Sequence, residues 1–270
     1  MTKNNLYSGF ANYKDYYTQW WKESFKKLEK IQIDFLKSNP HPKNYHWPKD
    51  ALHNFIRSWE YPFVYSNIFD LLRNRKKIKI LDVGSGVTFF PYSLSELGFS
   101  VIALDNDPKT KIGLNKSNQA MSKKYGELEI LIADAKKIPL KKESFDLVYS
   151  ISVLEHIPNN HLVIKELARI LKRNGFCILT FDINLNKNDI GVDSDGFKKL
   201  KENIDKYFIP YGQTRLTHPF DIISTKNSKY PLKRERKLIR YLKNIKRKLF
   251  GKNIINNYDL TSMGLVLKKK

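Results

Sequence analysis

The chain of 270 residues has one cysteine, Cys177, so no disulfide bond can form within it. This excludes the class of small secreted domains held together by disulfides, and it suits a reducing compartment. The segment from Met1 to Gly9 is polar and lacks the apolar core of a signal peptide. No window approaches the roughly 18 apolar residues that a membrane-spanning helix needs. We therefore expect a cytoplasmic protein.

Acidic residues are also scarce, with 27 aspartates and glutamates against 49 lysines and arginines, which gives a formal net charge of +22. Such a surplus favours anionic partners, namely nucleic acid, a membrane surface or a phosphorylated substrate. A lysine-rich composition also follows from codon bias in an AT-rich genome, so the charge alone identifies no partner. The hydrophobic share of 41% and the chain length predict a globular protein with one sizeable core.

The N-terminal zone, residues 1–77, is rich in aromatic residues and shows helical spacing. Apolar side chains recur at intervals of three and four from Tyr13 to Phe35, as one buried helical face requires. Proline disfavours helix in the residue before it, so Asn39-Pro40-His41-Pro42 ends this helix. A second helix is expected after Trp47-Pro48 and a third from about Pro62 to Arg73. We expect a helical extension that covers part of the site.

The middle zone, residues 78–182, alternates between short apolar runs and amphipathic segments. This alternation predicts a parallel sheet covered on both faces and joined by right-handed crossovers. Gly175 is expected to close the last helix, because glycine is common just past a helix end. The expected strands are Ile78–Val83, Ser100–Leu104, Leu128–Ala133, Phe145–Ser150 and Phe176–Phe181, and the expected helices are Pro91–Leu97, Ile112–Lys124 and Asn159–Leu171.

The last zone, residues 183–270, is irregular and is read as a variable insertion on the substrate side. A helix is expected from Phe197 to Tyr207 and a final strand from Leu260 to Lys268. Between them, Lys233 to Lys252 holds ten lysines and arginines against one acid, Glu235, with leucines and isoleucine on one helical face. Such a basic amphipathic helix either rests on an anionic membrane or packs its apolar stripe on its own domain.

A glycine-rich turn, Asp82-Val83-Gly84-Ser85-Gly86, follows the first expected strand of the middle zone. Glycines allow close approach of a ligand to the backbone, and the following helix presents free N–H groups. Nicotinamide-binding domains use a similar turn, but Phe89 stands where their third glycine would be and would obstruct a pyrophosphate. Asp82 is placed to meet a cationic amino group. Asp105, about 20 residues further on, is placed to accept hydrogen bonds from a ribose diol.

Taken in order, the motifs of residues 78–182 resemble class I S-adenosylmethionine-dependent methyltransferases of the small-molecule type. The family resemblance implies a Rossmann-like, doubly wound, mostly parallel α/β sheet with a final antiparallel strand, and S-adenosyl-L-methionine as cofactor. The quoted motifs are the glycine turn, Leu104-Asp105-Asn106-Asp107, Ala133-Asp134-Ala135, Phe145 to Ser150, Ser152 to His156, and Glu166 to Gly175. The implied cofactor-binding residues are Asp82, Gly84, Ser85, Gly86, Asp105, Asn106, Asp134, Ala135 and Ser150.

Two further segments have competing interpretations. His156, just beyond the fourth expected strand, is a candidate general base, or it only orients the loop and packs. Glu155 beside it is interpreted as structural. The segment Trp59-Glu60-Tyr61-Pro62 forms a lid that shapes the acceptor pocket, or it contributes aromatic residues to the core.

The histidines do not predict a metal site. His41, His46 and His53 match no standard ligand spacing, and no cysteine lies near them. His218-Pro219-Phe220-Asp221 is interpreted as a turn.

The methyl acceptor is the least determined part of the prediction. The texture around His46 to Leu52 and Ser58 to Pro62 is similar to methyltransferases of bacterial surface-polysaccharide clusters, which implies O-methylation of a sugar, a nucleotide-linked sugar or a phosphorylated precursor. The alternatives are a quinone or secondary metabolite, nucleic acid, or a catalytically inactive partner subunit. Ser150-Ile151-Ser152-Val153 lacks the Asn/Asp-Pro-Pro-aromatic loop of amino-methylating nucleic-acid enzymes, so nucleic acid is disfavoured.

Overall fold

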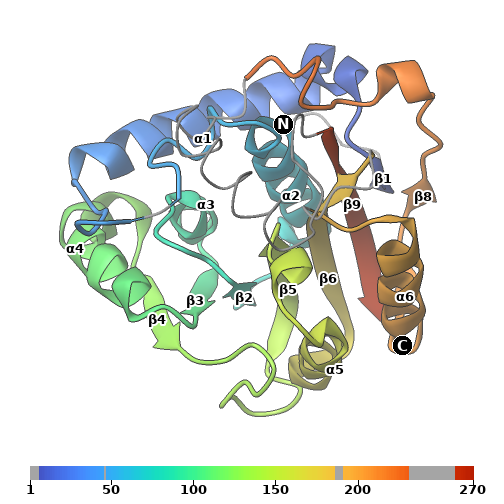
Figure 1. Ribbon diagram of the computed structural model, residues 1–270. Helices are drawn as coiled ribbons and strands as arrows, with labels where there is room; N and C mark the ends of the chain where they lie inside the picture. Colours follow the sequence, from blue (N-terminus) through green and yellow to red (C-terminus); the bar gives the residue numbers. More distant parts are fainter. Residues whose placement is uncertain (1–5, 46, 186–190, 231–258) are drawn as a thin grey trace, which may run out of the picture.

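The computed structural model describes residues 6–45, 47–185, 191–230 and 259–270 (Figure 1). Its centre is a nine-stranded sheet in the order β4-β3-β2-β5-β6-β9-β1-β8, with β7 paired to β9. Strands β2 to β6 are parallel to their neighbours, and β9 runs antiparallel to β6 and β1. The expected Rossmann-like sheet with a final antiparallel strand is therefore confirmed. The strands are β1 Tyr7–Phe10, β2 Lys79–Val83, β3 Ser100–Asp105, β4 Glu129–Ile132, β5 Phe145–Ile151, β6 Leu171–Asn184, β7 Phe208–Pro210, β8 Gln213–Thr214 and β9 Leu260–Lys269.

Helices cover both faces of the sheet and divide the core into two clusters. Because successive strand residues point to opposite faces, Ile80 packs in the cluster with α1 to α4, while Leu81 packs in the cluster with α5 and α6. The helices are α1 Gln19–Lys37, α2 Arg57–Leu72, α3 Phe90–Ser95, α4 Pro108–Tyr125, α5 Asn160–Ile170 and α6 Ser194–Asp205, and the short 3-10 helices are η1 Tyr13–Tyr17, η2 Leu154–His156 and η3 Pro219–Asp221.

The N-terminal zone differs from its expected helices in its first residues, because Tyr7–Phe10 forms strand β1 at the far side of the sheet. Gly9 and Phe10 pair with Gly264 and Met263 of β9, so the first and last described strands lie side by side (Figure 1). The aromatic residues from Tyr13 to Tyr17 form the 3-10 helix η1 rather than the start of α1, which Thr18 caps.

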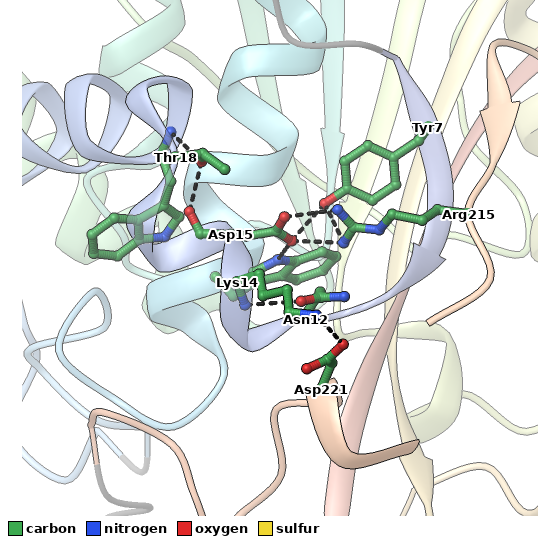
Figure 2. A network of polar contacts seen from close by, with 9 residues as sticks. Tyr7, Asn12, Lys14, Asp15, Thr18, Arg215 and Asp221 are labelled. Atoms are coloured by element: carbon green, nitrogen blue, oxygen red, sulfur yellow. Dashed lines mark hydrogen bonds and ion pairs between the residues drawn. The ribbon is translucent and has the colours of Figure 1, made fainter. Parts of the chain in front are cut away.

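A buried ion pair fastens this N-terminal strand to the rest of the fold (Figure 2). The carboxylate of Asp15 is 2% exposed and accepts hydrogen bonds from the Tyr7 hydroxyl at 2.7 Å and from the Trp59 indole at 2.8 Å. The guanidinium of Arg215 donates to both carboxylate oxygens at 2.7 Å and lies 3.8 Å from the centre of the Tyr7 ring. The cluster joins β1, η1 and α2 to the segment after β8.

Pro62 does not start a third helix as expected but lies inside α2, which runs unbroken from Arg57 to Leu72. A proline in this position cannot donate the usual hydrogen bond to the carbonyl four residues earlier, that of Ser58. The Trp21 indole of α1 donates to this carbonyl at 3.0 Å instead. A side chain from the neighbouring helix therefore replaces the missing backbone donor, and the helix continues.

Gly175 does not close α5, which ends at Ile170, five residues earlier. The left-handed residue of this turn is Asn174, with φ of 60°, and β6 has already begun. Gly175 is instead required by packing, since a Cβ there would lie 2.9 Å from the Lys172 carbonyl oxygen. The other expected strands and helices of residues 78–182 occur within a few residues of their predicted bounds.

The basic segment Lys233 to Lys252 lies outside the described residues. None of the helices in the described parts of the chain combines the length and the apolarity needed to cross a bilayer. The expected helix near residues 197–207 is α6, and the expected last strand is β9.

The replacement donor at Pro62 predicts the stability of two variants. Trp21→Phe leaves the buried Ser58 carbonyl without its indole donor, so its cost in unfolding free energy should exceed that of Trp20→Phe by about 1–3 kcal/mol. Trp20 is the matched control because it is a buried tryptophan of the same helix. In a Pro62→Ala background the backbone N–H is restored, and the excess cost of Trp21→Phe should shrink below about 1 kcal/mol. Urea unfolding measures the free energy of unfolding of Trp21→Phe and Trp20→Phe, each in the wild-type and the Pro62→Ala background. If the excess cost of Trp21→Phe were the same in both backgrounds, the indole would not replace the missing backbone donor.

Candidate active site

A cavity of about 610 Å³ opens at the carboxyl ends of the parallel strands. The chain leaves β2 toward β3 and β4 on one side, and β5 and β6 lie on the other, so the cavity spans a topological switch point. Ligands of open α/β sheets bind at this place. The volume is within the range of about 300–1,000 Å³ that is typical of small-molecule sites.

The glycine turn after β2 forms the floor of the cavity next to the switch point. Gly84 and Gly86 have φ of 77° and 56°, in the left-handed region that favours glycine. A Cβ on Gly84 would lie 2.4 Å from Val153 Cγ2. The turn is also closed from outside, because the Val87 N–H donates to the Tyr45 hydroxyl at 2.9 Å. The sequence motif is therefore a packed backbone turn facing the cavity.

Asp105 stands at the end of β3 and fixes the glycine turn. One of its carboxylate oxygens accepts a hydrogen bond from the Gly86 N–H and the other from the Asp107 N–H, both at 2.8 Å. Asp107 in turn caps α4, since its side chain accepts from the Lys109 N–H at 2.9 Å. Each Asp105 oxygen keeps further lone pairs, and Asp105 and Asn106 both line the cavity.

Asp82, the single acidic residue of β2, is buried, with a 4% exposed fraction, and it also lines the cavity. Burial raises the pKa of its carboxyl well above the usual value, and the negative charge of Asp105 raises it further. A cationic ligand group placed against Asp82 would return it to the ionised form. The site therefore offers a buried acid suited to an ammonium group.

The remaining expected cofactor residues are divided between the cavity and the core. Asp134 and Ala135 follow β4 and line the cavity, where the exposed Asp134 carboxylate accepts from the Lys136 N–H at 2.8 Å. Ser150 does not line it. Its side chain is fully buried, and its hydroxyl donates to the Val83 carbonyl at 2.9 Å, so it ties β5 to β2.

A cluster of charged groups lies at the other half of the cavity, where Arg57 and Asp182, which the sequence did not single out, line it with Ser152. Arg57 from the start of α2 forms an ion pair with Glu60 and donates to the Ser152 hydroxyl. Asp182 near the end of β6 lies with its Oδ1 4.0 Å from the Arg57 guanidinium and 3.5 Å from Ser152 Oγ. Behind it, the Glu155 carboxyl accepts from the Asp182 N–H at 2.9 Å. We call Arg57, Glu60, Ser152, Glu155 and Asp182 the acidic cluster.

His156 lines the cavity from η2 and is exposed. Its ring centre lies 5.9 Å from that of Trp47, whose side chain is 58% exposed. Although the residue is exposed, partial desolvation of its ring lowers the pKa of His156 below its usual value, and the nearby Arg57 charge lowers it further. Its place beside a half-exposed tryptophan puts it at the mouth of the cavity.

The residues of the segment Trp59-Glu60-Tyr61-Pro62 are divided between the core and the cavity wall. Trp59 is fully buried and stacks on Phe63, with ring centres 4.6 Å apart, so it belongs to the core. Tyr61 lines the cavity and also contacts Phe89 and Phe90. Phe89 is thus turned into the core rather than toward a ligand.

The histidines expected not to bind metal have other contacts. His41 Nε2 lies 3.1 Å from the Val87 carbonyl, next to the glycine turn. His53 lies between Asp50 and Glu29, 2.9 Å from each carboxylate. His46 lies outside the described residues, and His218 precedes the short helix η3. Within the residues that the structure describes, no group of three or more histidine, cysteine or acidic side chains is arranged to hold a metal.

Comparison with known proteins agrees with this geometry. The family described as "Methyltransferase domain" matches residues 81–179, which include the glycine turn, Asp105 and Asp134. A ubiquinone biosynthesis O-methyltransferase of Pelagibacter ubique is 32% identical over 113 residues, covering 42% of this chain and 44% of the relative. The sterol 4-C-methyltransferase strm-1 of Caenorhabditis elegans is 27% identical over 144 residues, covering 53% of this chain and 42% of the relative. The chain thus spans less than half the length of these curated relatives.

Among solved structures, a putative sarcosine dimethylglycine methyltransferase from Galdieria sulphuraria superposes with a TM-score of 0.54, covering 88% of this chain and 98% of that one. The sequence identity is 14%, so this likeness shows the fold alone. The fold and the matched family agree with each other. Within the matched range, the glycine turn, Asp105 and Asp134 lie together at the carboxyl ends of the strands. Residues 81–179 therefore match a methyltransferase domain, and the fold agrees with the S-adenosylmethionine dependence that this match implies.

Proposed function

We propose that this protein transfers the methyl group of S-adenosyl-L-methionine to a hydroxyl group of a small, uncharged acceptor that carries a ring. One observation carries the proposal: Asp82, Asp105 and Asp134 lie at or just after the ends of three neighbouring strands and line the same cavity as Arg57, Ser152 and Asp182 of the acidic cluster. One half of the cavity thus suits the cofactor, and the other half is left for the acceptor.

The residues present fit the proposed cofactor. The buried Asp82 would meet its amino group, Asp105 would accept hydrogen bonds from its ribose hydroxyls, and Asp134 with Ala135 would border its adenine. The turn at Gly84 and Gly86 brings backbone close to the ligand, and a Cβ there would meet Val153 or the Tyr45 hydroxyl. When bound, the cofactor supplies an electrophilic methyl group on a sulfonium. The protein's part is to hold an acceptor atom in line with that methyl group.

The direction of the acceptor follows from the strand order. Asp105 ends β3 and Asp182 lies two residues before the end of β6, and these strands are three strand spacings apart, or about 14 Å at roughly 4.8 Å for each spacing. A nucleoside held at β3 and β4 therefore directs its methyl-bearing end toward β5 and β6. Ser152 and Asp182 line the cavity there.

The charge of the lining supports an uncharged acceptor. Four aspartates line the cavity, Asp82, Asp105, Asp134 and Asp182, against two permanent cations, Arg57 and Lys136. Arg57 is already paired with Glu60. Despite the net charge of the whole chain, this lining disfavours the phosphorylated and nucleotide-linked acceptors that the sequence analysis included. It also disfavours nucleic acid.

The rings of the lining support an acceptor with a flat apolar face. Five aromatic side chains line the cavity besides His156. A phenol or quinol would stack on such rings, in agreement with the name of the Pelagibacter relative. A neutral sugar hydroxyl is the second candidate, favoured by the carboxylate of Asp182 and the amide of Asn54, which are groups that bind hydroxyls. The aromatic residues are Tyr45, Trp47, Phe55, Tyr61 and Phe90.

Binding and transfer measurements test the proposal directly. Calorimetry with S-adenosylmethionine and S-adenosylhomocysteine should give saturable binding, and radiolabelled methyl transfer should be found with a panel of phenols, quinols and neutral glycosides. Acid-bearing analogues of the same rings serve as controls and should be poor acceptors. Absence of cofactor binding would instead support the inactive partner subunit. Membrane contact through residues 233–252 remains a separate proposal.

Asp105→Asn should weaken cofactor affinity by at least tenfold, about 1.4 kcal/mol, because the amide offers one acceptor oxygen in place of two and no charge. Asp107→Asn is the matched control. Asp107 caps α4 and does not line the cavity, and asparagine caps as well as aspartate. Calorimetric affinities within about threefold of each other for the two variants would show that the strand-end assignment is wrong.

Cofactor binding should release a proton from Asp82. Burial raises the pKa of this carboxyl, so below the raised pKa the free protein holds it protonated, and an ammonium group favours its ionised form. Apparent affinity should therefore rise with pH until that pKa is passed. The proton release is measured by calorimetry in buffers of different ionisation enthalpy, and Asp82→Asn should abolish it.

S-adenosylhomocysteine distinguishes which cationic group meets Asp82, since it keeps the amino group and lacks the sulfonium. Equal proton release with both ligands supports the amino group. Release with S-adenosylmethionine alone would contradict the proposed orientation of the cofactor.

A further inference from the structure

The acidic cluster at the acceptor end of the cavity holds three carboxyl groups and one guanidinium. Glu60 and Arg57 come from α2, Glu155 from η2 and Asp182 from near the end of β6. Their hydrogen bonds differ, and the differences assign a separate state to each carboxyl group.

Glu60 is the carboxylate that the surrounding donors satisfy. It is fully buried and forms the ion pair with Arg57. Its Oε1 accepts hydrogen bonds from the Ser152 hydroxyl at 2.8 Å and from the Ser262 hydroxyl at 2.7 Å. A buried ionised carboxylate needs such donors, so Glu60 and Arg57 form a neutral pair with no acceptor atom facing the cavity.

Glu155 is the carboxyl group whose neutral form burial favours. Its Oε1 accepts from the Asp182 N–H, while its Oε2 is buried and has no hydrogen-bond partner among the described residues. Burial raises the pKa of Glu155 well above its usual value, and the negative charge of Asp182 raises it further. The neutral form of Glu155 is therefore favoured, which limits the charge that it adds to the cluster.

Asp182 is the carboxylate that still lacks a close donor. The single proton of the Ser152 hydroxyl is directed to Glu60 at 2.8 Å, so it is not available to Asp182 Oδ1 at 3.5 Å. The Arg57 guanidinium is 4.0 Å away. No closer side-chain donor to Asp182 occurs among the described residues, and its side chain is 15% exposed on the cavity.

We propose that Asp182 is the general base of methyl transfer, and that Arg57 faces its carboxylate across 4.0 Å while Glu60 takes the Ser152 hydroxyl proton, so the carboxylate is left to the acceptor hydroxyl. This inference rests on the proposed function. The acceptor oxygen attacks the methyl carbon, a C–O bond forms and the S–CH3 bond breaks with its electron pair left on sulfur. The hydroxyl proton moves to the Asp182 carboxylate and from there to solvent.

The electrostatics of the cluster suit this role. Burial raises the pKa of Asp182 to about 6, Arg57 opposes the rise and Glu60 adds to it. The carboxyl is therefore ionised at neutral pH, yet it is a stronger proton acceptor than an ordinary aspartate. The charged and titratable groups around it are Arg57 and Glu60 of α2 and Glu155 of η2, with His156 further out on the same short helix.

His156, the base expected from sequence, is the weaker candidate. Its pKa is lowered by partial desolvation of the ring and by Arg57, which makes it a poorer proton acceptor than an unperturbed imidazole. It also lies at the exposed mouth beside Trp47, whereas Asp182 lies deeper in the cavity.

Backbone strain at two places supports a built site. Ile56, directly before Arg57, and Ser152 have φ of 50°, although neither is glycine. For a β-branched residue such a conformation is an outlier, and strain of this kind gathers at functional sites. Both strained residues lie at the contact between Arg57 and Ser152.

A binding experiment with 4-nitrophenol tests the proposal without turnover. In complex with S-adenosylhomocysteine, the wild-type protein should bind the probe as the neutral phenol at pH above 6, because its hydroxyl donates to the Asp182 carboxylate. The phenolate absorption band should therefore fall on binding. Asp182→Asn should abolish this fall, whereas Asp195→Asn, an exposed aspartate of α6, should keep it. An unchanged phenolate band in the wild type would overturn the proposal.

The pH profile of transfer to the phenol panel is the second measurement. In the wild type, kcat/KM should rise with pH through about 6 and then level off, because protonated Asp182 cannot accept a proton. Asp182→Asn should lower kcat by at least 100-fold and remove this rise. His156→Gln should keep it. A variant lacking Asp182 that retains both the rate and the profile would overturn the proposal.

Cofactor calorimetry separates the two proposals. Asp182→Asn should bind S-adenosylmethionine within about threefold of the wild-type affinity, since Asp182 lies three strands from Asp105. A wild type that binds no cofactor would end the proposed function itself. Normal cofactor binding with no dependence of the probe or of the rate on Asp182 would end only the assignment of the base.

Discussion

The buried carboxylate of Glu60 holds together the two halves of the structure. It belongs to α2, outside the middle zone, yet it accepts from Ser152 after β5 and from Ser262 in β9, and it pairs with Arg57 on the cavity wall. A charge this deeply buried is tolerated only while all of its donors are in place. The position of α2 on the sheet, the direction of Arg57 and the hydrogen bonding of Ser152 are therefore fixed together. Through them, Glu60 also determines which carboxylate remains available to a ligand.

The sequence predicted the middle zone well because its signals are local. Each strand of residues 78–182 is a short apolar run, and Asp82, Asp105 and Asp134 follow such runs at recognisable spacings. Strand β1 gave no such signal, because it has four residues and its partners lie more than 200 positions away. Pro62 was misread for a related reason. The donor that lets α2 continue is a tryptophan of another helix, which no pattern around Pro62 reveals.

The acceptor half of the site could not be predicted from the sequence, because its charged residues Arg57 and Asp182 belong to no recognisable motif. Asp182 is a single aspartate near a strand end, and its surroundings come from α2, η2 and β9. Tyr45, which closes the glycine turn, likewise gave no signal in the sequence. Ser150 was expected at the cofactor because the family resemblance implied it, but a strand points alternate side chains to opposite faces, and this one reaches Val83. Net charge also did not predict the lining, since a chain of +22 has more aspartates than permanent cations around its cavity.

The antiparallel strand β9 has a consequence for how the molecule is made. Strand β1 pairs with β8 and β9, whose residues leave the ribosome long after its own. During synthesis, Tyr7 and its neighbours must therefore wait without a sheet partner, while the local crossovers between β2 and β6 can already assemble. Contacts across such a distance in sequence form slowly because they close a long loop. The molecule thus completes its sheet in two stages, and the edge that carries Asp15 and Arg215 is added in the second.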